Sequence, residues 1–263
     1  MGETASQRVV VLGAGRVATH IVPALVHAGY RVDQVCSRTE ASARAVAAPL
    51  GIPYTVGFDS LVTDADVYIV CVTDSALPEV AARIVERVGT KALFLHTAGC
   101  VSMELWREAG AVRYGILYPL QTFSKKRRVD MCEVSLFVEA SDEEAMREIE
   151  DLAYRLSGRV YRADSQRRAR LHIAAVFACN FANAMYGAAH RLLAEEGVPF
   201  DVLLPLIDET AAKVHTLAPR EAQTGPAVRG DGEVMRQHLE ALSRDEELYK
   251  IYEQVSNYIN RNR

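Results

Sequence analysis

The sequence predicts an α/β fold, with a doubly wound, mostly parallel sheet followed by an all-α C-terminal domain. Short apolar runs alternate with segments of helical spacing over the first 164 residues, and this alternation is typical of a largely parallel sheet. From Ser165 onward no strand-like run remains, and helical spacing dominates to the end of the chain. The two patterns predict two domains, residues 1–164 and residues 165–263.

Composition restricts the class of protein. The chain has 263 residues, of which 49% are hydrophobic and 24% charged, and its net charge is -4. These values are typical of one large or two modest globular domains and argue against a fibre, a disordered chain or a general nucleic-acid binder. The five cysteines form no Cys-x-x-Cys pair. Because five is an odd number and the cysteines are not paired in sequence, we expect reduced thiols. Reduced thiols are typical of a cytoplasmic protein.

Nothing in the sequence predicts a membrane partner. The first apolar run is too short for a signal peptide. The long apolar stretch 173–189 contains Asn180 and Asn183, which make it too polar for a membrane-spanning helix. The start of the chain, 1–6, fits the loose myristoylation pattern, but such short patterns recur by chance. We therefore expect neither a membrane nor a nucleic acid as partner.

The first apolar run, Val9–Leu12, leads into a glycine turn of the form Gly-x-Gly-x-x-Ala. Gly13 allows a tight bend, Gly15 lets the backbone approach a pyrophosphate, and Ala18 keeps the following helix close to the strand. The free N–H groups and the positive dipole end of that helix bind phosphate. The stretch predicts a Rossmann-type nucleotide site. The residues expected at the pyrophosphate are Gly13, Ala14, Gly15, Arg16 and Val17.

The second expected strand, 31–36, indicates which nucleotide binds. An NAD site has an acidic residue at the far end of this strand for the ribose 2′-hydroxyl, but the chain has Ser37, Arg38 and Thr39 there. Asp33 is an alternative, although at ~3.3 Å per residue it lies roughly 10–13 Å from the ribose end. The three residues favour a 2′-phosphate and thus NADP. The alternative for Arg38 is a solvated arginine at a helix start.

Two more expected strands end in polar clusters. The run 66–72 is followed by Thr73 and Asp74, and the run 92–95 by His96 and Thr97. Ligands of doubly wound sheets lie beyond the carboxyl ends of the strands, so these four residues are expected at the ribose and nicotinamide. His96 is also a candidate for polarising or protonating a substrate. Alternatively, Asp74 only caps a helix and His96 is structural.

The loop after the strand 114–118 carries Gln121, a neutral candidate for a substrate contact, and then the basic run 125–128. This run attracts an anionic substrate, acts as a targeting patch or is a solvated face, the last being the most frequent role of such a run. In the helical half, His172, Asn180 and Asn183 lie along one stripe of a long helix expected over 168–196. An amide in an apolar segment needs partners, either across a helix interface or in the cofactor crevice. His172 and Asn180 are catalytic candidates, and Asn183 is a substrate contact.

The loop 224–231 is the only glycine-rich and charged break in the helical half. Arg229, close to two glycines, can clamp a carboxylate or a phosphate of the substrate. Asp231 can equally cap the helix that follows. No metal-ligand spacing is present anywhere in the chain, and we expect no metal.

These motifs resemble a family of NADP-linked proteins with a Rossmann-like domain followed by a helical domain of unknown function. The resemblance covers nearly the whole chain and rests on 13–18, 96–99, 118–123, the Asn180-Phe181 helix and 224–231. More distantly, the chain is similar to the superfamily of 6-phosphogluconate dehydrogenase, β-hydroxyacid dehydrogenases, pyrroline-5-carboxylate reductase and deazaflavin-linked NADP reductases. The resemblance implies a homodimer through the helical domain, with the substrate between the two domains.

The chain departs from this superfamily at the proton donor. β-Hydroxyacid dehydrogenases use a lysine on the first helix of the second domain, where this chain has no lysine. His172 or His96 is left as the donor, and Tyr118 stands where related sequences tend to carry histidine. The resemblance implies an NADP-dependent oxidoreductase that transfers a hydride between NADPH and a C=O or C=N group of a small polar metabolite. The alternative is an NADP(H)-binding sensor or interaction module without turnover.

Overall fold

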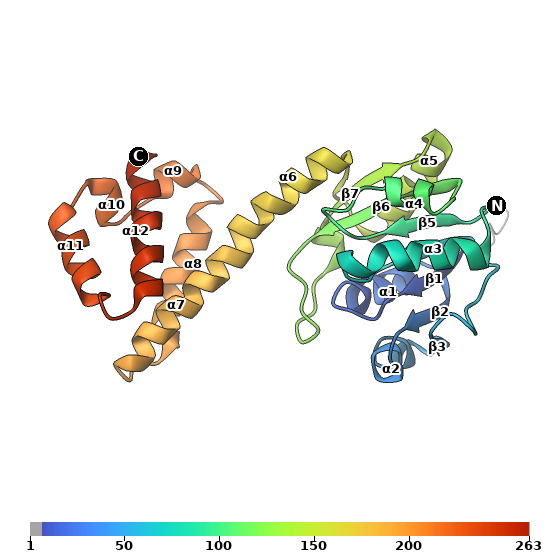
Figure 1. Cartoon of the computed structure of the whole chain (residues 1–263), viewed down its shortest axis with the longest axis horizontal. Helices are drawn as coiled ribbons and strands as arrows, with labels where there is room; N and C mark the ends of the chain where they lie inside the picture. The colour runs from blue at the N-terminus through green and yellow to red at the C-terminus, as the bar shows by residue number, and fades with distance from the viewer. Residues whose placement is uncertain (1–6, 263) are drawn as a thin grey trace. The chain divides into compact units, whose positions relative to one another are not determined.

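The computed structural model describes residues 7–262, so the myristoylation-like pattern lies outside the described residues. The chain divides into two compact units, Met1–Cys179 and Asn180–Arg263 (Figure 1). The expected change from strands to helices occurs between β8 and α6, at residues 162–165. The two compact units divide further on, inside a long helix.

The first unit contains an eight-stranded sheet of order β3-β2-β1-β4-β5-β6-β7-β8. Every neighbouring pair is parallel except β6 with β7, so the predicted doubly wound, mostly parallel sheet is confirmed. The strands are β1 (Arg8–Leu12), β2 (Arg31–Ser37), β3 (Tyr54–Val56), β4 (Val67–Val70), β5 (Leu93–His96), β6 (Arg113–Leu120), β7 (Ser135–Ala140) and β8 (Val160–Arg162).

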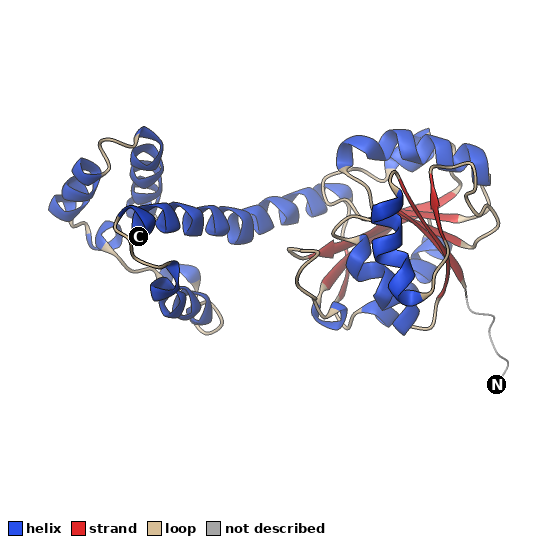
Figure 2. Ribbon diagram, turned by 90° about the horizontal axis from the view of Figure 1, so that it is seen from below, coloured by secondary structure: helices blue, strands red, loops and turns tan. Residues whose placement is uncertain are grey.

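Helices cover both faces of this sheet (Figure 2). Side chains alternate along β1, so that Val9 and Val11 join one buried apolar cluster and Val10 and Leu12 join the other. The first cluster includes residues of α1 and α5, and the second includes residues of α3 and α4. The helices are α1 (Ala18–His27), α2 (Glu40–Ala47), α3 (Leu77–Val88), α4 (Glu104–Glu108) and α5 (Glu143–Leu156), with short η1 (Ala48–Leu50), η2 (Asp74–Ala76) and η3 (Met131–Glu133).

The sheet differs from the sequence-based expectation in two places. Helix α4 was not predicted, although it buries Trp106 completely. Strand β6 continues through Pro119 and Leu120, where a loop was expected, and the prediction of a loop from Pro119 is wrong. Pro119 is tolerated because β6 pairs with β5 only over 113–116, so the missing N–H removes no bond on that side.

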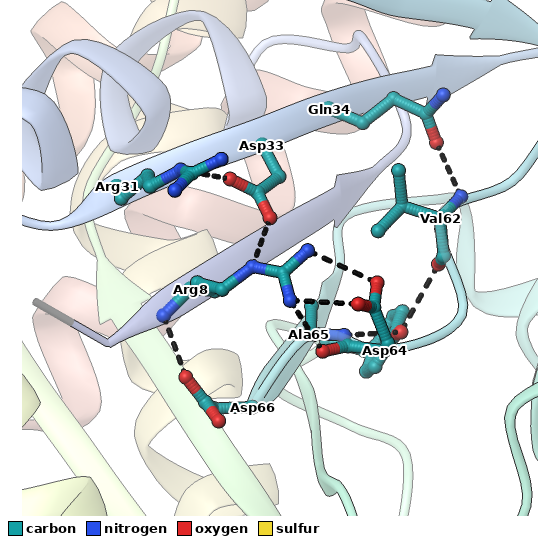
Figure 3. Close-up of polar contacts among 9 residues, drawn as sticks. Arg8, Arg31, Asp33, Gln34, Val62, Asp64, Ala65 and Asp66 are labelled. Carbon is teal, nitrogen blue, oxygen red and sulfur yellow. Dashed lines mark hydrogen bonds and ion pairs between the residues drawn. The ribbon is translucent and has the colours of Figure 1, made fainter. Parts of the chain in front are cut away.

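A network of charged side chains joins the amino-terminal ends of β1 and β2 (Figure 3). Arg8 bonds Asp33 at 2.5 Å and Asp64 at 2.8 Å, and its backbone N–H donates to Asp66. Arg31 bonds the same Asp33 carboxylate at 2.7 Å. The Arg8 guanidinium also lowers the pKa of the Asp64 carboxyl. The Asp33 carboxylate is thus paired with two arginines near the amino-terminal ends of the strands, whereas the glycine turn follows the carboxyl end of β1. This position argues against Asp33 as a ribose ligand.

The second unit contains helices and no strand among its described residues. The long helix that leads into it begins in the first unit with α6 (Ser165–Ala175), continues through a π-helical turn, η4 (Val176–Phe181), and ends with α7 (Ala182–Glu195). This agrees with the helix expected over 168–196. The remaining elements are η5 (Phe200–Leu203), α8 (Leu204–Lys213), α9 (Pro219–Ala222), α10 (Pro226–Arg229), α11 (Gly232–Ala241) and α12 (Glu246–Arg261).

Candidate functional site

A cavity of about 730 Å³ lies at the carboxyl ends of β1, β2 and β4. Its volume falls in the range of about 300–1,000 Å³ that small-molecule and cofactor sites occupy. The cavity lies where ligands of doubly wound sheets bind. Eight of the residues expected at the cofactor line it, namely Gly13, Ala14, Gly15, Arg16, Val17, Ser37, Arg38 and Thr73.

The glycine turn closes one side of the cavity. Gly13 has a φ of 104°, and a Cβ there would lie 2.3 Å from the carbonyl oxygen of Cys71 at the end of β4. A side chain is therefore excluded at this position. A Cβ at Gly15 would meet nothing nearer than 3.9 Å, so this glycine leaves open space at the start of α1. No side chain caps that helix start, which fits the binding of a phosphate to its N–H groups.

The charge of the cavity lining fits a nucleotide with several phosphates. Arg16, Arg38, Arg83 and Lys125 line it, whereas no aspartate or glutamate does. Complementary charge of this kind favours the more highly charged NADP over NAD. The site therefore suits the phosphates of NADP. The acidic residue that binds the ribose 2′-hydroxyl in an NAD site is not among the lining residues.

Sequence reasoning missed Ser42, Phe58 and Arg83, which line the same cavity. The guanidinium of Arg83 lies 4.3 Å from the ring centroid of Phe58, a cation–π contact. One face of η2 and α3 forms part of the cavity lining through Ala76, Val80 and Arg83. The helical spacing of these three residues is the signal in the sequence that would have located this face.

Four expected cofactor residues do not line the cavity, namely Thr39, Asp74, His96 and Thr97. The hydroxyl of Thr39 caps α2 by accepting a bond from the Ser42 N–H at 3.4 Å. The Thr97 hydroxyl donates to the carbonyl oxygen of Val70 at 3.5 Å. These contacts stabilise the elements that surround the cavity.

His96 is fully buried at the end of β5, where its ring stacks on Trp106 with centroids 6.2 Å apart. Its Nδ1 accepts a bond from the Ala98 N–H at 3.2 Å. Burial, and after it the positive charge of Arg168, lower the pKa of His96 to about 3. The ring is thus neutral and enclosed, and this geometry argues against His96 as a proton donor.

A tyrosine–histidine pair lies at the carboxyl end of β6. The hydroxyl of Tyr118 is 3.0 Å from Nδ1 of His172, a half-buried residue of α6. Burial raises the pKa of Tyr118 to about 12, so the phenol keeps its proton at neutral pH. Gly99 makes room for this ring, because a Cβ there would lie 2.7 Å from Cζ of Tyr118. The sequence suggested His172 but gave no sign of Tyr118 as its partner, since 54 residues separate them.

Arg168 fixes the start of α6 on the sheet. Its side chain is fully buried, forms an ion pair with Glu139 of β7 and donates to the carbonyl oxygen of Val101 at 2.8 Å. It also donates to the carbonyl oxygen of Ala163 at 3.4 Å. Because His172 lies one helical turn after Arg168, these bonds also set the position of the tyrosine–histidine pair. A buried arginine of this kind was not expected from the sequence.

The other sequence-based candidates are exposed. Gln121 bonds its own neighbour, since its side-chain oxygen accepts from the Thr122 N–H at 2.7 Å. Asn180 and Asn183 belong to the second unit, where both side chains are exposed rather than buried in the described structure. Arg229 is the exposed last residue of α10.

The carboxylate of Asp231 caps α11 by accepting from the Val234 N–H at 3.4 Å, which agrees with the capping alternative. Within the described part of the chain, no group of three histidine, cysteine, aspartate or glutamate side chains is placed to hold a metal ion. No helix formed by the described residues is long and apolar enough to cross a membrane.

Comparison with known families supports the assignment of the cavity. Residues 8–94 match the family described as NADP oxidoreductase, coenzyme F420-dependent. Residues 134–259 match a domain of unknown function, DUF2520. The cavity falls almost entirely within the first of these matches, and the tyrosine–histidine pair has its histidine in the second. No curated protein matches the chain.

Several solved structures of oxidoreductases are similar to this chain. A crystal structure from Bacteroides fragilis, assigned as an NADP oxidoreductase, is 46% identical, covers 97% of this chain and 98% of its own, and has a TM-score of 0.92. An imine reductase from Myxococcus stipitatus in complex with NADP+ is 19% identical over 96% of this chain and 91% of its own, with a TM-score of 0.63. A 1-pyrroline-5-carboxylate reductase from Streptococcus pyogenes is 12% identical over 97% and 98%, with a TM-score of 0.63.

The last two similarities show the fold alone, whereas the first extends to sequence over almost the whole of both chains. The prediction of an NADP-dependent enzyme is therefore confirmed, and NADP is its cofactor. The chain belongs to the family of NADP oxidoreductases in which a Rossmann-type NADP domain is followed by the helical domain of unknown function.

Proposed function

We propose that the protein is an NADPH-dependent reductase that transfers a hydride to a C=O or C=N group of a small polar metabolite. The observation that carries this proposal is the Tyr118–His172 contact, which holds a titratable side chain at the carboxyl edge of the sheet that bears the NADP cavity. A reductase of this type needs a proton source as well as the cofactor. The imine reductase and pyrroline-5-carboxylate reductase folds support a C=N group as one acceptor class.

The cofactor residues take the following roles in this proposal. Gly13, Ala14, Gly15, Arg16 and Val17 hold the pyrophosphate, and Ser37 and Arg38 hold the 2′-phosphate, next to Thr39, whose hydroxyl caps α2. Thr73 faces the ribose and nicotinamide, whereas Asp74, His96 and Thr97, which do not line the cavity, stay candidates for this end of the cofactor. When bound, NADPH supplies the hydride.

His172 supplies the proton to the substrate oxygen or nitrogen. Because the Tyr118 phenol keeps its proton, its O–H donates to Nδ1 of His172. With Nδ1 accepting this bond, the His172 ring carries a proton on Nε2, and that N–H is the group offered to the substrate. Tyr118 therefore selects the tautomer and orients the ring. Gln121, Asn180, Asn183 and Arg229 stay candidates for holding polar groups of the substrate, with Asn180 also a catalytic candidate.

The test is NADPH oxidation with a panel of keto acids, aldehydes and cyclic imines. We expect turnover with at least one class, and we expect His172→Ala to lower kcat by about 10²–10⁴-fold. The Kd of NADPH should stay within about twofold, since His172 is outside the cavity lining. His190→Ala, which removes a histidine from α7, is the matched control. NADPH binding without turnover of any class would support the alternative, a sensor without catalysis.

A second test addresses the choice of cofactor. Arg38→Ala should raise the Kd of NADPH tenfold or more, about 1.4 kcal/mol, with little change for NADH. The control is Arg44→Ala, which removes an exposed arginine of α2 that does not line the cavity. Equal losses for the two cofactors would contradict the assignment of Arg38 to the 2′-phosphate.

We further propose a homodimer through the helical unit and a cytoplasmic location. Only Ala227 and Leu248 are buried hydrophobic residues among the described residues from 180 onward. Large apolar side chains of that unit are instead exposed, including Leu192, Val202, Leu204, Leu206, Val214, Leu217, Val255 and Tyr258. An exposed apolar surface of this extent marks an interface. Sedimentation should therefore give twice the monomer mass, and Leu206→Asp should shift it toward monomer. A monomeric wild type would contradict the homodimer. The cytoplasmic location is a separate proposal, which cell fractionation tests.

A further inference from the structure

The basic loop between β6 and β7 is folded into a defined turn. Ser124 and Arg127 form an isolated antiparallel bridge, and the Ser124 hydroxyl accepts a bond from the Lys126 N–H at 3.2 Å. The bridge puts Lys125 and Lys126 at the tip of the turn. Lys125 lines the cofactor cavity, whereas Lys126 does not. The two adjacent lysines thus have different surroundings, although the sequence presents them as one charged run.

His20 attaches this turn to the start of α1. Its Nδ1 lies 2.9 Å from the carbonyl oxygen of Arg16, and its Nε2 lies 3.1 Å from the carbonyl oxygen of Arg127. A neutral imidazole donates a hydrogen bond to one of these oxygens, and an imidazolium donates to both. The ring is buried, with only 7% of the residue exposed, and Phe123 packs on it with ring centroids 4.8 Å apart.

We infer that Lys125 is a ligand of the cofactor's pyrophosphate and that His20 is the residue that positions it. Through His20, the turn is joined to Arg16 at the start of α1, the expected pyrophosphate end of the cavity. Arg38 and Ser42 belong to the other end, near the carboxyl end of β2 and the start of α2. A lysine offers a flexible point charge, which suits the diphosphate that NADPH and NADH share.

Replacing Lys125 should weaken the binding of NADPH and NADH alike, whereas replacing Arg38 should weaken the binding of NADPH alone. Lys125→Ala should raise the Kd of both NADPH and NADH by about tenfold, because the mutation removes a charge-assisted hydrogen bond to the diphosphate. The ratio of the two Kd values should stay unchanged. Cofactor fluorescence measures both constants without turnover, so a failed substrate screen does not affect the result. Lys126→Ala is the control and should leave both constants within about twofold of the wild type.

Three outcomes would overturn the inference. Loss of NADPH affinity alone would assign Lys125 to the 2′-phosphate. Equal effects of Lys125→Ala and Lys126→Ala would indicate general attraction by the loop, and unchanged constants for Lys125→Ala would indicate a solvated side chain.

The role of His20 is tested by a double-mutant cycle. If His20 positions Lys125, then Lys125→Ala should change the Kd less than about twofold in a His20→Ala background. Independent, multiplying effects would contradict a positioning role. His20→Gln keeps a side-chain donor and should give an intermediate Kd, which covers the case in which His20→Ala fails to fold. A general loss of structure would not produce this dependence on Lys125.

Discussion

Replacing Arg168 should weaken the first unit more than most single substitutions. Arg168→Ala removes the ion pair to Glu139 and the bonds to the carbonyl oxygens of Val101 and Ala163. Breaking a buried ion pair by removing one partner costs about 3–5 kcal/mol. Ser165 still donates to the Glu139 carboxylate through its N–H and its hydroxyl, which moderates the loss. We therefore expect a decrease of about 3 kcal/mol in the free energy of unfolding.

The single tryptophan provides the assay. Trp106 is fully buried in contact with His96 and Phe94, so its fluorescence reports unfolding of the first unit. With a urea m-value of about 2 kcal/mol/M, the expected decrease lowers the midpoint by about 1.5 M. Arg168→Met together with Glu139→Gln should recover part of the loss, because no unpaired charge is left behind. A change of less than about 0.5 kcal/mol in Arg168→Ala, the range of ordinary surface substitutions, would refute the reasoning.

Further predictions concern the glycines and the buried histidine. Gly13→Ala should abolish measurable NADPH binding, because its Cβ would collide with the carbonyl oxygen of Cys71, and a titration that gives a wild-type Kd would contradict this. Gly99→Ala should lower kcat while the Kd of NADPH is unchanged, since its Cβ displaces the Tyr118 ring; an unchanged kcat would contradict the role of the pair. The folded-state pKa of His96 lies below its unfolded value of 6.5, so protons bind the unfolded chain better and stability falls as pH decreases from about 6.5 toward 3. Urea titrations should show a loss of about 1.4 kcal/mol per pH unit from this residue, and His96→Gln should show a shallower slope between pH 6 and 4.5. Equal slopes would contradict the buried neutral state.

Much of the sheet was predictable because its strands are continuous apolar runs covered on both faces. Val9–Leu12 supplies side chains to both buried clusters, and such a run has few alternatives to a central parallel strand. The glycine turn was predictable for a related reason, since Gly13 has a backbone conformation and a neighbouring carbonyl that exclude other residues. By contrast, Pro119 suggests a loop by local rules, and only its pairing with β7 shows that it belongs to a strand.

The site was less predictable where it depends on contacts between distant segments. The sequence indicates His96 by its place at a strand end, but it contains no sign that Trp106 and Arg168 enclose the ring. The pairing of Tyr118 with His172 likewise depends on how α6 is anchored to β7. Arg83 was missed for the same reason, and the alternatives for the basic run 125–128 stayed open, because a solvated charge and a cavity-lining charge look alike in sequence.

The central claim is that the Tyr118–His172 pair serves a hydride transfer from NADPH. The most direct measurement uses NADPH deuterated at the transferable position, a panel of imines and carbonyl compounds, and mass spectrometry of the products. We predict that deuterium appears at the reduced carbon with the wild type, and that its rate of appearance falls about 100-fold or more in His172→Ala with NADPH still bound. Deuterium transfer at the same rate in both proteins, or NADPH binding with no deuterated product from any compound, would contradict the account.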